Sequence, residues 1–213
     1  MSNYLGLAGK KILIVEDVEM NQYLARHIME SWGCVVEVVD NGSIAVEKAE
    51  SKDFDLVLMD IQMPVMDGME ATKRIRKLEN TSRATVPIVA LTANAQRAEC
   101  EVYLKIGMND WLAKPFEEPA LYRMVSKNVR KDSMNTDLIQ EAAPIPHAPV
   151  LKEKLYDLSM IEAISGGDRT FVDKMLSLFL ETAPHTLADL QSSADKGDWQ
   201  MLSKHAHKLK STI

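Results

Sequence analysis

The sequence predicts an α/β fold: a five-stranded parallel sheet, doubly wound by helices, followed by a smaller all-α region. Through residue 131, short runs rich in Val, Ile and Leu alternate with segments of helical periodicity. Continuously apolar runs of strand length are typical of parallel strands buried on both faces. Beyond residue 152 only helical periodicity remains. Glycines fall at the expected turns, at Gly33, Gly42, Gly68 and Gly107.

Five β-α units make up the first region, which is expected to span residues 1–132. Right-handed crossovers between parallel strands place helices on both faces of such a sheet. We expect strands at residues 11–15, 35–39, 55–59, 87–91 and 110–113, and helices at residues 20–32, 42–51, 67–78, 95–106 and 117–130.

A linker is predicted at residues 133–152. Three prolines between residues 144 and 149 forbid a helix there and favour an extended spacer. The second region, residues 153–213, is predicted to be a partial helical bundle. Its helices are expected at residues 157–165, 170–194 and 199–213, with Gly197 and Asp198 providing the turn and cap before the last one.

Composition excludes several classes of protein. The chain has 213 residues, 46% hydrophobic and 26% charged, and a net charge of −6 without clustered Lys or Arg, so we expect no nucleic-acid partner. Its apolar runs are shorter than the roughly 20 residues that span a bilayer, so we expect no membrane partner for this segment and a cytoplasmic location. Cys34 and Cys100 are expected to be free, buried thiols in a reducing compartment.

Acidic side chains follow two of the predicted strands. Glu16 and Asp17 come after the first strand, and Asp60 comes after the third. If these strands are neighbours, the three carboxylates meet, and each like-charged pair at ~4 Å costs about 4 kcal/mol at an effective dielectric constant of 20. Such a cluster requires a cation, and oxygen ligands of this kind favour Mg²⁺.

Two further strand ends add a hydroxyl and an ammonium. Thr92 closes the fourth apolar run and Lys114 follows the fifth. A carboxylate beside a cation, an ammonium and a hydroxyl is equipped to attack phosphorus, because phosphoryl transfer depends mainly on positioning and charge neutralisation. The predicted product is an aspartyl phosphate on Asp60.

Residues 9–131 resemble a response-regulator receiver domain of the CheY-like, flavodoxin-like type. The motifs are Ile-Leu-Ile-Val-Glu16-Asp17, Leu-Met-Asp60-Ile-Gln-Met-Pro64-x-Met-Asp67-Gly68, Ala-Leu-Thr92-Ala and Ala-Lys114-Pro115. The resemblance implies strand order 2-1-3-4-5, phosphorylation of Asp60 and a cis bond before Pro115. It also implies Mg²⁺ held by Asp17, Asp60 and the backbone carbonyl of Gln62, with Glu16 acting through water.

The resemblance also implies a conformational switch. In that family the hydroxyl of the residue matching Thr92 moves toward the phosphoryl group, while an aromatic side chain, here Trp111, turns inward. An indole is bulkier than the more usual Tyr or Phe. Simple packing of the last strand is therefore an open alternative for Trp111.

We expect helical partners to dock beside the acidic cluster. The expected contact residues on the first helix are Met20, Asn21 and Leu24, next to Pro115 and Phe116 on the same rim. Met20 and Leu24 could equally belong to a core stripe, whereas polar Asn21 favours exposure.

An apolar stripe predicts the buried face of the last helix. At about 100° per residue, His207 lies far from this stripe and should be exposed, whereas His205 borders it. The stripe consists of Trp199, Leu202, Ala206, Leu209 and Ile213.

The segment Ala206-His207-Lys208-Leu209-Lys210-Ser211 resembles the motif of the histidine phosphotransfer (HPt) family. An imidazole with a free Nε2 is a competent phosphoryl acceptor near neutral pH. Ser211 departs from that family's usual Gly. The family's domain is a four-helix bundle, and this chain stops inside the helix that carries His207, so we expect a fragment of a longer protein.

Together these patterns predict a two-component phosphorelay module from a hybrid sensor histidine kinase. Asp60 would accept a phosphoryl group from phospho-histidine and pass it to His207. The expected partners are the phospho-histidine of an upstream kinase, an HPt domain in cis or in trans, and a downstream response regulator. No ATP-binding glycine motif is visible, so the catalytic kinase part would lie elsewhere.

Two other functions stay open at this point. A haloacid-dehalogenase-like phosphatase would also use Asp60 as a nucleophile, but that family has a second Asp where this chain has Gln62. A receiver-like scaffold that is never phosphorylated would not need the complete set of polar strand-end residues, Glu16, Asp17, Asp60, Thr92 and Lys114.

Overall fold

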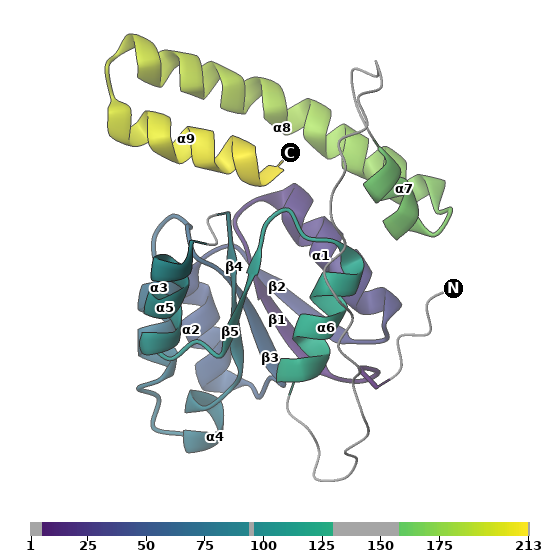
Figure 1. Cartoon of the computed structure of the whole chain (residues 1–213), viewed down its shortest axis with the longest axis vertical. Helices are drawn as coiled ribbons and strands as arrows, with labels where there is room; N and C mark the ends of the chain where they lie inside the picture. Colours follow the sequence, from purple (N-terminus) through teal and green to yellow (C-terminus); the bar gives the residue numbers. More distant parts are fainter. Residues whose placement is uncertain (1–5, 94–95, 130–157, 213) are drawn as a thin grey trace.

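A computed structural model describes residues 6–93, 96–129 and 158–212. Its first part, the sheet region (residues 6–129), contains a parallel sheet of order β2-β1-β3-β4-β5 (Figure 1). The strands are β1 (Lys11–Val15), β2 (Val35–Val39), β3 (Leu56–Asp60), β4 (Ile88–Thr92) and β5 (Asp110–Ala113). The predicted fold class and strand order are therefore confirmed.

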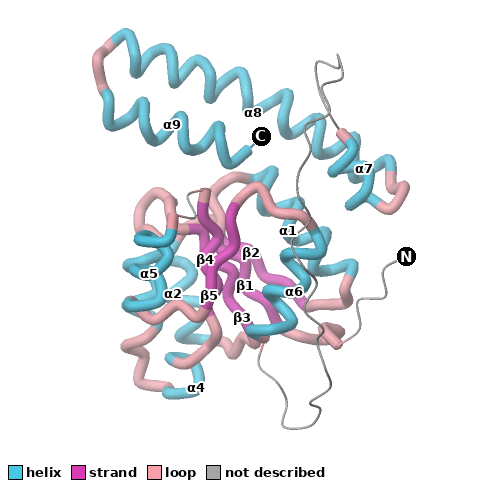
Figure 2. The backbone as a smooth tube through the Cα atoms, viewed as in Figure 1, coloured by secondary structure: helices cyan, strands magenta, loops and turns pink. Residues whose placement is uncertain are grey.

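Helices cover both faces of the sheet, as right-handed crossovers require (Figures 1 and 2). On one face lie α2 (Gly42–Ser51), α3 (Gly68–Ile75) and α5 (Arg97–Lys105). On the other face lie α1 (Glu19–Ser31) and α6 (Glu118–Asn128). A short helix that the sequence analysis did not predict, α4 (Thr81–Ala84), begins where the Asn80 side chain accepts a hydrogen bond from the backbone N–H of Arg83.

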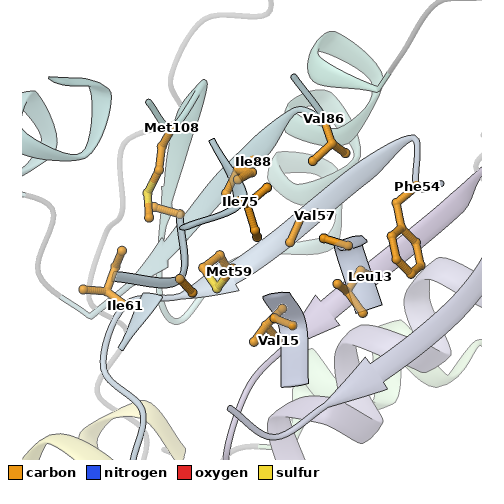
Figure 3. Packing of buried hydrophobic residues seen from close by; sticks show 14 of the residues in the cluster. Leu13, Val15, Phe54, Val57, Met59, Ile61, Ile75, Val86, Ile88 and Met108 are labelled. Carbon is orange, nitrogen blue, oxygen red and sulfur yellow. The ribbon is translucent and has the colours of Figure 1, made fainter. Parts of the chain in front are cut away.

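Alternate strand residues build two apolar cores, one on each face. Leu13, Val57 and Ile88 point into the core that Figure 3 shows, together with Phe54 and Ile75. All residues of β3 and β4 are buried, because helices pack against both sides of these central strands. Both cysteines are free and buried, as predicted.

The second part, the helical region (residues 158–212), contains α7 (Ser159–Ser165), α8 (Arg169–Asp195) and α9 (Trp199–Thr212). The Asp168 carboxylate caps α8 by accepting from the backbone N–H groups of Thr170 and Phe171. Gly197 turns the chain with a φ of 66°, and Asp198 caps α9, as expected. α9 packs back along α8 (Figure 1). The predicted linker at residues 133–152 lies outside the described residues.

The predicted buried stripe of α9 is wrong in part. The Trp199 side chain is 72% exposed and Ala206 is exposed, whereas Leu202 and Leu209 are half-buried. The physical reason is that α9 contacts mainly α8 and, within the described residues, no third helix of the region lies over Trp199. Ile213 lies outside the described residues.

A third apolar cluster joins the two regions. It contains Val18 and Met20 at the start of α1, and Phe171, Met175 and Leu178 of α8. The helical region therefore packs on the outer side of α1, while the inner side of α1 packs on the sheet. None of the helices within the described residues is long and apolar enough to cross a bilayer.

Candidate phosphoryl-acceptor site

Polar side chains gather at the carboxyl edge of the sheet, where ligands bind in open α/β folds. β1 pairs with β3, so Glu16, which follows β1, lies beside Asp60, the last residue of β3. β4 pairs with β3 and ends at Thr92. Lys114 directly follows β5, and its backbone N–H bonds to the Thr92 carbonyl at 2.7 Å. The condition that the first and third strands are neighbours is thus met.

Three carboxylates form a compact cluster at this edge. Ligand atoms of Glu16, Asp17 and Asp60 all lie within 4.8 Å of one another. Burial, together with the charge of Asp60, raises the pKa of Glu16 to about 7 and also raises the pKa of Asp17. A divalent cation would remove this repulsion, and the all-oxygen donor set fits Mg²⁺.

Lys114 bridges two of these carboxylates. Its ammonium donates to Asp60 Oδ2 at 2.8 Å and to Glu16 Oε2, and all three side chains are almost fully buried. Burial alone would lower the pKa of Lys114, but the charges of Glu16 and Asp60 and their hydrogen bonds together raise it. Lys114 therefore carries a fixed positive charge beside the Asp60 carboxylate.

The segment after β3 is held close to Asp60. The backbone N–H of Gln62 donates to Asp60 Oδ1 at 3.3 Å, and the Gln62 side chain is exposed. Gly68 starts α3 against the end of β3, where an added Cβ would overlap the Asp60 carbonyl oxygen. The adjacent Asp67 caps α3 by accepting from the backbone N–H of Glu70. The peptide bond between Lys114 and Pro115 is cis, as the resemblance implied.

Thr92 and Trp111 lie on the α5 side of the site. The Thr92 hydroxyl is buried and lies 3.4 Å from the Tyr103 hydroxyl of α5. Trp111 is half-buried and packs on the apolar core of that face. The switch role of both residues stays a prediction.

The five expected docking residues do not form one open surface. Met20 is buried beneath α8, and Leu24 is half-buried and packs on the cluster that joins the regions. Asn21 is half-buried, and its amide donates to Glu16 Oε1 at 3.0 Å. Pro115 is exposed, and Phe116 is half-buried against the core below α6.

His207 lies on α9, whose C-terminal half approaches the carboxyl edge of the sheet (Figure 1). The side chain of His207 lies outside the described part of the structure. The neighbouring Lys208 is close enough to Asp17 for its charge to counteract the rise in the Asp17 pKa.

The sequence did not assign Tyr103 or Lys208 to the site, and it assigned Asn21 a different role there. Tyr103 contacts Thr92 but belongs to no motif, and only its helical spacing on α5 places it there. Lys208 was visible as a cation beside His207, but its closeness to Asp17 depends on how α9 lies over the sheet. Asn21 was expected to be a docking residue, and its bond to Glu16 follows from α1 starting directly after the acidic pair.

The sheet region and the helical region each match a known protein family. The model of the response regulator receiver domain matches residues 12–126, more than half of the chain. The chain belongs to the response-regulator receiver family. The sheet region is its receiver domain. The model of the Hpt domain matches residues 174–213, which cover most of α8 and all of α9.

Relatives carry the receiver and the helical region together. The aerobic respiration control sensor protein ArcB of Escherichia coli is 32% identical over 208 residues, which are 96% of this chain and 25% of that protein. The sensor histidine kinase GacS of Pseudomonas protegens is also 32% identical over 208 residues, covering 96% of this chain and 22% of that protein. The chain therefore spans about a quarter of the length of these relatives. With its receiver and Hpt domains, it is a two-component phosphorelay module.

A solved receiver structure resembles the sheet region in sequence and fold. The receiver domain of the sensor histidine kinase PA1611 from Pseudomonas aeruginosa is 44% identical, with a TM-score of 0.53, covering 57% of this chain and 98% of that one. Magnesium is coordinated in its active site cleft. The receiver domain described here has its own acidic cluster of Glu16, Asp17 and Asp60.

Proposed function

We propose that Asp60 accepts a phosphoryl group from a phospho-histidine and that His207 is the next acceptor. The observation that carries this proposal is the contact between Asp60 Oδ2 and the Lys114 ammonium, 2.8 Å apart within a buried cluster of carboxylates. A carboxylate oxygen of Asp60 attacks phosphorus, the P–N bond of the donor breaks, and the imidazole leaves with the bonding electrons and takes up a proton. The product is an aspartyl phosphate.

The residues around Asp60 neutralise the charge of the transferred group. We assign Mg²⁺ to Asp17, Asp60 and the Gln62 backbone carbonyl, with Glu16 acting through water; the cation supplies charge neutralisation for phosphoryl oxygens. Lys114 provides a second positive charge and Thr92 a hydroxyl donor. Thr92 and Trp111 are proposed to form the switch that reads the phosphorylated state.

The proposed module has a receiver domain at residues 1–132, a linker at residues 133–152 and part of an HPt bundle at residues 153–213. Its proposed partners are the phospho-histidine of an upstream sensor kinase, an HPt domain in cis or in trans, and a downstream response regulator. The proposed location is the cytoplasmic part of a hybrid sensor histidine kinase. The similarity to sensor proteins over 96% of the chain supports this assignment.

Labelling with acetyl phosphate tests the proposal. Intact-mass analysis should find one added phosphoryl group in the presence of Mg²⁺ and none after chelation of the metal. Asp60→Asn should lose the label completely, because an amide cannot form the mixed anhydride. His207→Gln is the control for the acceptor and should still be labelled on Asp60. Absence of label on the wild-type chain would refute the proposal, and unlabelled protein with fast hydrolysis of many phosphate monoesters would indicate a phosphatase.

Onward transfer needs its own measurement. In a time course with the prelabelled wild-type chain, the base-labile aspartyl phosphate should decline as an acid-labile, base-stable phospho-histidine appears. His207→Gln should retain the aspartyl form. Equal decay in both proteins, without phospho-histidine, would show that His207 is not an acceptor.

A further inference from the structure

Helix α8 presents an apolar stripe to the receiver domain. Phe171, Met175 and Leu178 follow one another at the helical spacing i, i+4, i+7, and none is more than 2% exposed. They pack on Val18 and Met20, which lead into α1 directly after the acidic pair. The stripe therefore covers the part of α1 that is nearest to the phosphoryl-acceptor site.

Phe171 is the anchor of this contact. Its ring stacks on the His27 ring with centroids 3.9 Å apart, and on the Tyr23 ring with centroids 5.4 Å apart. Both partners lie on α1, one turn from each other. Because the Phe171 side chain is fully buried, its removal leaves a cavity between the two regions.

Helix α9 extends the same interface, because it also contacts α1. The helical region thus lies on α1 with two helices, α8 and α9. The part of α1 that they cover is closed to a protein that approaches from solution.

We infer that α8 occupies the α1 surface in cis and so excludes helical partners that approach in trans. This inference rests on the proposed function of Asp60 and names how access to that site is regulated. Because α8 and α1 belong to the same chain, the cis contact forms in an intramolecular step and competes with any partner in trans. The apparent affinity of a partner in trans falls in proportion to the fraction of molecules whose α1 face is open. Small phosphoryl donors need no docking surface and are unaffected.

Two phosphoryl donors distinguish the docking of a protein on α1 from the phosphorylation of Asp60 itself. The full chain is labelled either with acetyl phosphate or with a purified, separately phosphorylated histidine phosphotransfer domain at micromolar concentration. Phe171→Ala should raise the rate from the protein donor by at least ~10-fold, because truncation of a buried Phe strongly opens the cis contact. The rate from acetyl phosphate should stay the same.

The chain offers a matched control on the same helix. Phe179 is 37% exposed and lies outside the cluster that joins the regions, so Phe179→Ala should change neither rate. His27→Ala opens the contact from the receiver side without altering α8, and should raise the protein-donor rate by a few-fold. If Phe171→Ala disturbs folding of the helical region, His27→Ala still tests the contact.

The results distinguish the cis contact of α8 from the phosphorylation of Asp60. Unchanged protein-donor rates in both Phe171→Ala and His27→Ala, with normal acetyl phosphate labelling, would overturn the cis contact and leave the proposed function intact. An equal increase in Phe179→Ala would also overturn it. Failure of acetyl phosphate to label the wild-type chain would instead refute the proposed function.

Discussion

The receiver domain and the helical region bury their apolar side chains in different ways. In the receiver domain, helices on both faces cover the sheet, and all residues of β3 and β4 are buried. In the helical region, Phe171 is buried partly by its contact with α1, while Leu180, Leu187 and Trp199 are more than half exposed. The receiver domain therefore has a core of its own, whereas the helical region depends on the receiver domain for part of its burial.

The largest expected effect is the loss of stability when a buried side chain of the receiver core is truncated. Leu58→Ala in β3 removes a fully buried side chain and should lower the free energy of unfolding by about 2–5 kcal/mol. Urea denaturation followed by circular dichroism measures this loss. A loss below ~1 kcal/mol would show that the sheet is not the rigid core that its burial indicates.

Mg²⁺ should stabilise the receiver domain selectively. At a Mg²⁺ concentration 100 times the dissociation constant, the gain in stability is about 2.7 kcal/mol. Asp17→Asn removes one of the clustered carboxylates and should abolish most of this gain, whereas His207→Gln should not change it. Thermal unfolding with and without chelator measures both. An equal gain in Asp17→Asn would place the cation elsewhere.

Thiol reactivity reports on the receiver domain alone, because Cys34 and Cys100 both lie there. Burial, and secondarily the charge of Asp55, raises the pKa of Cys34 to about 11 from an ordinary 9.0. At pH 8 the reactive thiolate is therefore about 100-fold scarcer than for an ordinary thiol, and its amount should rise tenfold per pH unit until pH 11. Iodoacetamide alkylation followed by mass spectrometry measures the rate. Rapid alkylation of native protein at pH 8 would indicate that this part of the domain opens readily.

The smallest effect is expected at the exposed face of the helical region. Trp199→Ala removes the largest side chain type, yet the stability should change by less than about 0.5 kcal/mol, because the indole is 72% exposed. Denaturation curves at two protein concentrations measure the change. A loss above ~1 kcal/mol, or one that depends on concentration, would show that Trp199 is covered in solution.

Much of the receiver domain could be predicted from sequence, because its signals are local. Continuous apolar runs gave the strands to within a residue, and polar residues directly after them, such as Asp60 and Lys114, could be assigned to one sheet edge. The short helix at Thr81–Ala84 was missed because four residues carry no periodicity.

The contacts between the two regions could not be predicted in the same way. Helical periodicity marks an apolar face but does not say which surface covers it. It wrongly assigned Trp199 to a buried stripe. It did not decide whether Met20 belongs to the core or to a docking surface, and the structure shows Met20 buried beneath α8. The contact between Phe171 and His27 joins two helices that are far apart in the sequence, so no short stretch of sequence predicts it.

Two successive residues of α1 connect the packing of α8 to the acidic cluster. Met20 lies under α8, and the next residue, Asn21, holds the Glu16 carboxylate in the acidic cluster. If attachment of α8 alters the geometry of that bond, it alters the affinity of the cluster for a cation. Reciprocity then requires the cation to change the attachment of α8 by the same factor. Through this one turn of α1, cation binding at the acidic cluster and packing of α8 on the receiver domain become coupled equilibria.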